Sequence, residues 1–338
     1  MQAYTKLKEN RQGLRDIIPL PKPFTLVVEP SSLCNFKCTM CFQSTSSSRY
    51  FADNRRNMPF ELYENIIRQI KDWDGGKFKV MKLSLYGEPF LNPRFCDMLA
   101  LASNSYIAER IETTSNVSLL TPYMSRRLIT GKLDYLRVSV YSPDQDKHER
   151  ITGSNIKVGV IHENLRVLQA IKREMDSKTP FVAVKMLDAY SDENERFREM
   201  YSDVADEVYI DKPHNWVGSE EKSFTRSLYG GDNPNFHTDM QSQDNGQYAC
   251  GQSFYILSVR SNGDIAPCCV DYAGGTNVGN INDTSLKEIW QGEPMRHFWT
   301  TQLSNNKHQN PSCRNCEIYR SSYYSRDNVD GVSIERLL

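Results

Sequence analysis

The chain has 338 residues, of which 39% are hydrophobic and 25% charged, and its formal net charge is -1. This length is sufficient for one large and one small domain, each with a buried core. The balanced charge, the absence of a long apolar run and the absence of a charged and then apolar leader give no indication of nucleic-acid binding, a membrane span or export. The nine cysteines are therefore expected to be reduced thiols in a cytoplasmic protein.

Strands and helices alternate along the first two thirds of the sequence. Hydrophobic periodicity predicts six strands, at 25–30, 79–87, 110–116, 135–142, 181–188 and 207–211. Helical patterns lie between them, at 60–73, 94–106, 122–130, 158–175 and 194–204. Six strands and five crossovers are too few for a closed eight-stranded barrel. The sequence therefore predicts an α/β fold, a partial (β/α)6 TIM-like barrel with its site at the C-terminal strand ends.

The predicted strands carry polar residues at alternate positions, where a closed barrel is normally filled with Val, Ile and Leu. Because alternate strand residues share a face, these side chains are expected to point into one lumen. They are Lys82, Ser84, Tyr86, Glu88, Glu112, Thr114, Asn116, Arg137, Ser139, Tyr141, Lys185, Tyr209 and Asp211. A polar lumen indicates a ligand with polar groups, unless some of the strands are edge-like and expose these faces to water.

The segment CNFKCTMC follows the first predicted strand and places Cys34, Cys38 and Cys41 in a C-x3-C-x2-C spacing. Three thiolates on one short loop can hold three irons of a [4Fe-4S] cluster and leave the fourth iron without a protein ligand. A zinc site normally takes four protein ligands, and a disulfide framework gives no reason for this clustering. The spacing resembles the signature of the radical SAM superfamily, which implies a [4Fe-4S] cluster and S-adenosylmethionine (SAM). Met40 is a departure, since the family often has an aromatic residue before the last cysteine.

The same resemblance implies contacts to SAM. The YGEP element at 86–89 resembles the glycine-glutamate-proline element of the family, so Gly87 and Glu88 would hold the methionine amino group, with the Glu88 carboxylate as acceptor. Taken alone, the element also fits a surface turn. Asn116 and Ser139 would contact the ribose and the methionine carboxylate. Phe42 lies where the family reads adenine with a backbone group, although a phenylalanine there also fits core packing.

A second cysteine-rich region follows a long polar stretch, 215–247, which has the composition of a linker or lid. The segment FYILSVRSNGDIAPCC predicts a hairpin with a type I′ turn at Asn262-Gly263, and SLKEIW predicts a short helix. This order, closed by a C-x2-C pair, resembles the SPASM and twitch auxiliary cluster domains. The resemblance thus covers about 25–320 and implies a small cysteine-rich α+β domain after the barrel.

The resemblance also implies one auxiliary [4Fe-4S] cluster with four thiolate ligands. The candidate ligands are Cys250, Cys268, Cys313 and Cys316. Since successive strand residues point to opposite sides, Cys269 is not expected to bind the same cluster as Cys268. Core packing, ligand exchange with Cys268 and hydrogen donation to a substrate radical, which would make the enzyme an epimerase, stay open for Cys269. A four-cysteine zinc knuckle fits the same spacing, and Cys96 is expected to be a packing residue.

These motifs together imply a radical SAM oxidoreductase. A 5′-deoxyadenosyl radical would take hydrogen from a hydroxylated small molecule, and the auxiliary cluster would accept an electron. Lys185, Arg137 and Tyr141 are candidates for holding the substrate or taking a proton, and each also fits a structural ion pair or hydrogen bond. The expected partners are the small-molecule substrate and an external electron donor such as a flavodoxin or ferredoxin, with no nucleic acid and no membrane.

The sequence is compatible with two substrate classes and with one non-enzymatic function. A sugar, aminocyclitol or nucleotide sugar is favoured over a peptide or protein side chain, because the 24 residues before Thr25 leave no room there for a leader-binding module. A non-enzymatic cluster or zinc scaffold, or a redox sensor, would leave YGEP and the polar lumen unexplained. The expected units are an N-terminal extension (1–24), the radical SAM barrel (25–214), the linker or lid (215–247), the auxiliary cluster domain (248–320) and a C-terminal tail (321–338).

Overall fold

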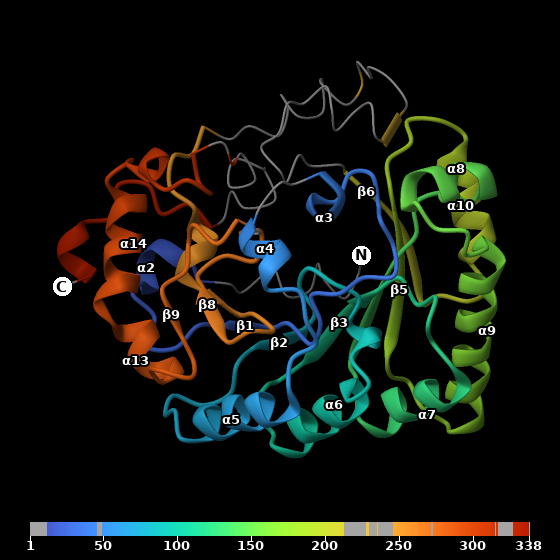
Figure 1. Cartoon of the computed structure of the whole chain (residues 1–338), viewed down its shortest axis with the longest axis horizontal. Coiled ribbons are helices and arrows are strands. Elements are labelled where there is room, and N and C mark those ends of the chain that lie inside the picture. Colours follow the sequence, from blue (N-terminus) through green and yellow to red (C-terminus); the bar gives the residue numbers. More distant parts are fainter. Residues whose placement is uncertain are drawn as a thin grey trace.

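The computed structural model describes residues 12–45, 49–212, 228–229, 235, 246–271, 273–314, 316 and 327–337. Its framework is a nine-stranded sheet with the order β6-β5-β4-β3-β2-β1-β7-β8-β9 (Figure 1). The first six strands are parallel and adjacent in chain order. They are β1 (Thr25–Val28), β2 (Val80–Leu83), β3 (Ile111–Ser115), β4 (Tyr135–Ser139), β5 (Phe181–Leu187) and β6 (Glu207–Asp211). All six predicted strands and the α/β class with a parallel core are thereby confirmed.

The five predicted crossover helices are also present and cover the outer side of the sheet (Figure 1). They are α5 (Phe60–Lys71), α6 (Phe95–Asn104), α7 (Pro122–Thr130), α9 (Val158–Glu174) and α10 (Glu193–Tyr201). α5 illustrates the periodicity on which these predictions depend. Its buried side chains recur at helical spacing and are those of Tyr63, Ile66, Ile67 and Ile70. The sequence did not indicate α8 (Gln145–Thr152), a polar helix capped by the side chain of Asp144 and ended by Gly153 in the left-handed region.

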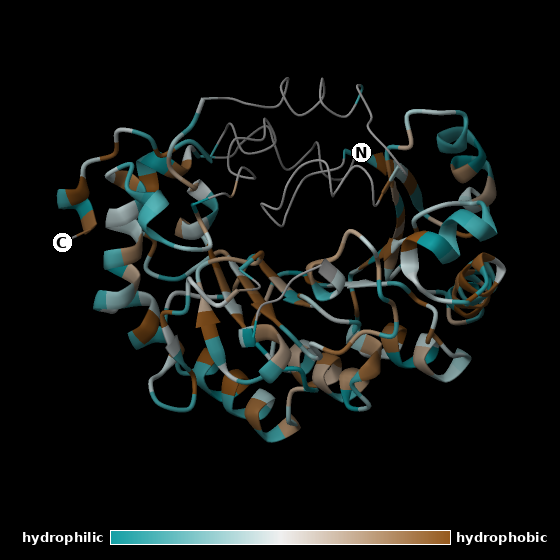
Figure 2. Ribbon diagram, turned by 45° about the horizontal axis from the view of Figure 1, so that its top comes forward, coloured by the Kyte–Doolittle hydropathy of each residue, from teal (hydrophilic) through white to brown (hydrophobic). Residues whose placement is uncertain are grey.

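The polar residues of neighbouring strands lie at the same levels of the sheet. Arg137 is the register partner of Thr114, and Lys185 is the partner of both Ser139 and Tyr209. The intervening residues Leu136 and Val138 of β4 are fully buried in the hydrophobic core. Hydrophobic colour marks several central strands and the helices around them in Figure 2. In β4 the predicted division into an apolar and a polar face is therefore confirmed. β3 departs from it, because the buried residues that alternate with Glu112 and Thr114 include the polar Thr113 and Ser115.

The cysteine-rich unit continues the barrel sheet. β7 (Ile256–Val259) pairs in parallel with β1, and β8 (Asp264–Ala266) and β9 (Gly279–Asn280) follow it in antiparallel order. The predicted helix in SLKEIW is α13 (Leu286–Gln291), which starts with a capping box at Ser285, and α14 (Glu293–Leu303) follows it. Because β7 lies beside β1, the second unit and the barrel share one sheet.

The hairpin between β7 and β8 is confirmed, but the predicted type I′ turn is wrong. Gly263 has φ of 93°, whereas Asn262 is not in the positive-φ region that a type I′ turn needs at both positions. The Gly263 amide donates to the Arg260 carbonyl, and the Arg260 amide donates to the Asp264 carbonyl, each at 2.9 Å. The result is a three-residue loop that ends in a left-handed glycine. Asn262 instead uses its side chain, which donates to Asp264 at 2.7 Å.

Residues before the barrel pack on the C-terminal unit. The Trp290 indole donates to the Leu20 carbonyl at 2.8 Å, and Arg336 donates to the Arg15 carbonyl at 2.7 Å. The predicted linker or lid at 215–247 lies outside the described residues except at 228–229, 235 and 246–247. Among the described helices, none has the length and apolar character needed to cross a membrane.

Candidate functional site

The cysteine loop is fixed by backbone hydrogen bonds to the end of α8. The amides of Lys37 and Thr39 each donate at 2.8 Å to carbonyls of that helix, at Thr152 and Ile151. Within the loop, the Cys41 amide donates to the Cys38 carbonyl at 2.9 Å. The unpredicted helix α8 therefore helps to hold the loop that carries the three predicted cysteines.

The three thiols share one partly dry environment. Burial raises the pKa of Cys34 to about 11, and burial also raises the pKa of Cys38 and Cys41. The neighbouring Cys41 and Cys34 raise the pKa of Cys38 further, so the thiols are within electrostatic reach of each other. Such thiols become thiolates only when a positive group compensates their charge, which the irons of a cluster do. Among the described residues, no three His, Cys, Asp or Glu side chains form a site for a single metal ion.

Tyr141, two residues after the end of β4, contacts the cysteine loop. Its side chain is hydrogen-bonded to the Cys38 thiol, and the charge of Cys38 together with burial raises the pKa of Tyr141. The sequence placed Tyr141 among the candidates for holding the substrate. Its position favours support of the cysteine loop over contact with a substrate.

Gly87 allows the YGEP element to lie directly on the backbone before the cysteines. A Cβ atom on Gly87 would stand 2.4 Å from the carbonyl oxygens of Ser31 and Leu33, a distance that real side chains do not adopt. The Glu88 amide donates to that Leu33 carbonyl at 2.7 Å. The two segments that the sequence linked to SAM are thus in contact, and only glycine fits the crossing.

Glu88 is 3% exposed and crosslinks the YGEP element to the end of β3. Its Oε1 accepts from the Phe90 amide (3.1 Å) and the Ser115 hydroxyl (2.7 Å), and its Oε2 accepts from the Asn116 amide (2.8 Å). A carboxylate offers about four acceptor positions, so one position on Oε2 remains for a further donor. Burial raises the pKa of Glu88 to about 7, although the three hydrogen bonds favour the charged form.

The other three predicted SAM contacts lie around this element. Asn116 directly follows β3, and its side chain donates to Asn35 of the cysteine loop at 3.0 Å. Ser139 ends β4 at the level of Lys185. Phe42 follows the last cysteine at the start of α3 (Phe42–Thr45). Its ring packs edge-on against the Tyr86 ring, with 4.9 Å between the ring centroids. Asn116 and Phe42 are therefore placed with the cysteine loop and YGEP, while Ser139 joins the polar face of the sheet.

The polar face carries paired charges. Lys185 lies 2.8 Å from Asp211, and Lys82 lies 3.7 Å from Glu112. Arg137 donates to Thr114 at 3.2 Å. Burial and the charge of Arg137 lower the pKa of Lys185, and Asp211 opposes this effect. A buried lysine of this kind can exchange a proton more readily than an exposed one.

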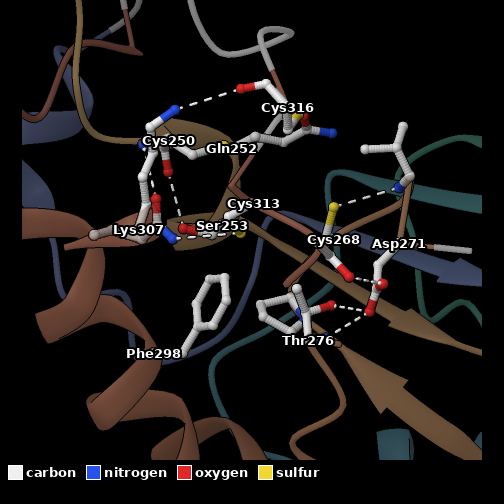
Figure 3. A pocket seen from close by; sticks show the side chains of 14 residues that line it. Cys250, Gln252, Ser253, Cys268, Asp271, Thr276, Phe298, Lys307, Cys313 and Cys316 are labelled. Carbon is white, nitrogen blue, oxygen red and sulfur yellow. Dashed lines mark hydrogen bonds between the residues drawn. The ribbon is translucent and has the colours of Figure 1, made fainter. Parts of the chain in front are cut away.

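The structure brings the four predicted auxiliary cysteines to the lining of one cavity. Figure 3 shows Cys250, Cys268, Cys313 and Cys316 around it. Burial raises the pKa of Cys250 and Cys313 to about 12 and that of Cys268 well above its ordinary value. The Val270 amide donates to the Cys268 sulfur at 3.4 Å. The thiols therefore need a compensating positive group here too, as a cluster would provide.

Cys269 is not among the residues that line this cavity. The predicted strand alternation does not explain this difference from Cys268, because β8 ends at Ala266 and both cysteines follow it. Its sulfur accepts from the Gln252 side chain at 2.9 Å. Burial raises the pKa of Cys269, but Lys82 and Arg137, both on the polar face of the barrel, oppose this. Cys268 thus lines the auxiliary cavity, and Cys269 lies within electrostatic reach of charged residues of the barrel.

Asp271 is a residue of the auxiliary cavity that the sequence analysis missed. Its carboxylate accepts from the Thr276 amide (2.7 Å), the Ser312 hydroxyl (2.5 Å) and the Arg260 guanidinium (2.9 Å). Burial opposes the charge, yet Arg260 and these donors hold the pKa of Asp271 below its usual value. The available signal was an acidic residue two positions after a cysteine pair.

Comparison with known proteins identifies both units. The model of the radical SAM superfamily matches residues 28–190, and the model of the SPASM iron-sulfur cluster-binding domain matches 250–317. The tungsten-containing aldehyde ferredoxin oxidoreductase cofactor-modifying protein of Pyrococcus furiosus is 24% identical over 330 residues, with 87% of each chain covered.

Two solved structures share the fold. BtrN in complex with AdoMet and 2-DOIA has a TM-score of 0.56 at 17% identity, covering 88% of this chain and 94% of that one. The structure of anSMEcpe with bound AdoMet and the Cp18Cys peptide has a TM-score of 0.59 at 16% identity, covering 92% and 91%. The matched domains imply a [4Fe-4S] cluster, SAM and auxiliary iron-sulfur chemistry. The chain is a radical SAM enzyme with a C-terminal SPASM iron-sulfur domain.

Proposed function

We propose that this enzyme oxidises an alcohol carbon of a hydroxylated small molecule and that the auxiliary cluster accepts the second electron. One observation carries the proposal: Cys268 lines the auxiliary cavity, while its neighbour Cys269 lies within electrostatic reach of Lys82 and Arg137. A substrate held by the polar face would therefore stand close to an electron acceptor. In this superfamily a reduced [4Fe-4S] cluster and SAM together supply a 5′-deoxyadenosyl radical.

The cluster ligands follow from the two cysteine groups. We assign Cys34, Cys38 and Cys41 to the SAM cluster, and the four cysteines that line the auxiliary cavity to the auxiliary cluster. In this assignment Glu88 offers its remaining acceptor position to the methionine ammonium, and Gly87 keeps that carboxylate beside the cysteine loop. Asn116, Ser139 and the Phe42 backbone complete the proposed SAM contacts.

Lys185 and Arg137 are the proposed substrate residues. When bound, the cofactors would take a hydrogen atom and one electron from the substrate, and loss of the hydroxyl proton would complete the conversion of an alcohol to a carbonyl. Lys185 is the candidate proton acceptor, because burial lowers its pKa and Asp211 at 2.8 Å would hold the ammonium that forms. Charged and hydroxyl-bearing side chains on the same face suit a sugar, aminocyclitol or nucleotide sugar better than an apolar substrate. BtrN, of similar fold, is seen with AdoMet and 2-DOIA.

Modification or epimerisation of a peptide is the second candidate. Two observations favour it: the fold similarity to anSMEcpe with a bound peptide, and the position of the Cys269 thiol beside the polar face, where it could return a hydrogen atom to a substrate radical. A resulting thiyl radical would need one electron and one proton, with the electron coming from an external iron-sulfur or flavin protein.

The experiment is anaerobic turnover of the reconstituted enzyme with SAM, dithionite and a panel of sugars, aminocyclitols, nucleotide sugars and peptides. We expect 5′-deoxyadenosine and a carbonyl product of a hydroxylated small molecule in equal amounts. The Lys185→Met variant should form 5′-deoxyadenosine but much less carbonyl product. Incorporation of solvent deuterium at an inverted carbon, or coupling to peptides alone, would replace the first candidate by the second.

A further inference from the structure

Glu29 is a buried carboxylate that the proposed reaction does not use. It directly follows β1, which lies between β2 of the barrel and β7 of the SPASM unit, and it is 1% exposed. Its Oε1 accepts from the Tyr86 amide at 3.2 Å, and its Oε2 accepts from the Ser261 amide at 3.0 Å. The two oxygens of the Glu29 carboxylate therefore bind backbone amides that follow two different strands, β2 and β7.

The two amides belong to the two cofactor sites. Tyr86 is the first residue of YGEP, next to Gly87 and Glu88. Ser261 directly follows Arg260, whose guanidinium holds both the carbonyl and the carboxylate of Asp271 at the auxiliary cavity. The chain from Glu88 through Glu29 to Asp271 thus consists of buried hydrogen bonds and short backbone segments.

A small pocket lies along this path. Its lining includes Glu29, Tyr50, Tyr86 and Arg260. Among the described residues, the hydroxyl of Tyr86 and the Nε and Nη1 atoms of Arg260 have no hydrogen-bond partner. Because these groups are not tied to each other, the hydrogen bonds of Glu29 are a main polar link between the YGEP element and the β7–β8 turn. The Ser32 and Ser261 hydroxyls, 3.2 Å apart, add a second contact nearby.

We propose that Glu29 is a positioning residue that couples SAM binding to the auxiliary cluster, by fixing the Tyr86 and Ser261 amides with its two oxygens. This inference rests on the cofactor assignments proposed above. Coupling between two sites is reciprocal, so SAM shifts the midpoint potential of the auxiliary cluster, and the redox state of that cluster changes the affinity for SAM. A carboxylate is required, because an amide side chain has only one acceptor oxygen and would face one of the two N–H groups with its own NH2.

Ser261 offers a test that leaves Glu29 in place. It is the first central residue of the turn closed by the Gly263 amide and the Arg260 carbonyl, a position where proline is favoured. Ser261→Pro removes the amide proton that Glu29 accepts, and it also removes the hydroxyl. Ser261→Ala removes the hydroxyl alone and is the matched control.

The experiment uses the full chain with both clusters. We compare three quantities between the variants: the iron content, the equilibrium affinity for SAM, and the midpoint potential of the auxiliary cluster. The potential is measured by EPR-monitored redox titration with and without SAM. We expect SAM to shift the potential in the wild type and Ser261→Ala. In Ser261→Pro the shift should be lost and SAM affinity should fall roughly fivefold or more, at unchanged iron content.

A second pair of variants tests the inference even if Ser261→Pro does not fold. Glu29→Gln should also lose the shift, whereas Glu193→Gln, at a similarly buried glutamate bonded to Ser142 and Lys147, should retain it. Wild-type coupling in Ser261→Pro and Glu29→Gln overturns the inference and leaves the proposed function standing. No shift in the wild type, with two clusters and bound SAM, also overturns the inference alone. A wild type that assembles one cluster, or does not bind SAM, overturns the assignments and the inference together.

Discussion

Glu88 is the residue at which burial and charge compete most directly in the proposed SAM site. Its pKa is raised from 4.5 to about 7 by burial. Because this pKa is higher in the folded protein than in the unfolded chain, the Glu88 carboxyl contributes most to the free energy of unfolding below about pH 4.5. That contribution is lost as the pH rises through about 7. The cofactor ammonium requires the ionised form, so SAM binding releases a proton below pH 7. We expect SAM affinity to rise as the pH approaches about 7 and to level off above it.

The check is SAM binding to the reconstituted protein at several pH values, with Glu88→Gln as the matched variant. The glutamine cannot ionise, so its SAM affinity should be weaker and flat through neutral pH. An equal pH dependence in the variant and the wild type would assign the titration to another group.

The cysteine pair gives a second prediction at this scale. Cys268 lines the auxiliary cavity and Cys269 does not. Cys268→Ala should therefore lower iron from about eight to about four per chain, while Cys269→Ala should keep about eight. Iron and sulfide analysis after anaerobic reconstitution measures the difference. The reverse pattern would show that the segment after β8 presents the other sulfur to the cluster.

Cysteine spacing made the two thiol groups predictable, because the C-x3-C-x2-C and C-x2-C patterns are local. Asp271, Arg260 and Glu29 were not predictable as a connected group. Glu29 and Ser261 are 232 positions apart in the sequence, and no local pattern in either segment indicates that they are in contact. Tyr141 was placed in the lumen by strand alternation, but its hydroxyl turns to Cys38, which periodicity does not report.

At the scale of elements, the contact between YGEP and the cysteine loop depends on the missing side chain of Gly87. Gly87→Ala places a Cβ 2.4 Å from two backbone oxygens, so the loops must separate. We expect a loss of about 1 to 3 kcal/mol in the free energy of unfolding, as for overpacking, together with weaker SAM binding. Chemical denaturation of the unreconstituted protein measures the stability.

Gly159→Ala is the control for this change. Gly159 lies in the first turn of α9, and a Cβ there meets no atom within 4 Å. This variant should be stabilised by about 0.4 to 1 kcal/mol, because alanine restricts the unfolded chain. Equal behaviour of the two variants would contradict the steric account of Gly87.

The periodic elements were read correctly from the sequence, and the exceptions have physical causes. α5 and α9 have apolar stripes, whereas α8 reads QDKHERIT and has no such stripe, so only capping by Asp144 and Gly153 defines it. The turn at Asn262-Gly263 fits a type I′ sequence, but hydrogen bonds of the Asn262 side chain to Asp264 accompany a three-residue loop instead. Turn sequence alone does not contain those partners.

For the whole molecule, the shared sheet predicts that the barrel depends on the SPASM unit. Leu26, Val27 and Val28 of β1 are at most 2% exposed, and β7 covers one edge of that strand. A chain that ends at residue 245 would expose this apolar edge, which favours aggregation. We expect the shortened chain to aggregate or to melt at a clearly lower temperature, by size-exclusion chromatography and circular dichroism. A monomer with the melting curve of the full chain would contradict this dependence.

The pairing of β7 with β1 was beyond sequence reasoning, although both strands were predicted. Local patterns indicated a hairpin for β7 and β8, and the order of cysteines indicated a separate small domain. The parallel partner of β7 lies some 230 positions earlier in the chain. The local sequence of a hydrophobic strand does not indicate which distant strand pairs with it.

The central claim is that the chain holds two iron-sulfur clusters on either side of one substrate space. Its most direct test is the amount of iron, sulfide and zinc per chain after anaerobic purification and reconstitution. The account predicts about eight irons, about eight sulfides and no stoichiometric zinc. About four irons with one zinc would contradict it, because Cys250, Cys268, Cys313 and Cys316 would then form a structural knuckle that cannot accept an electron.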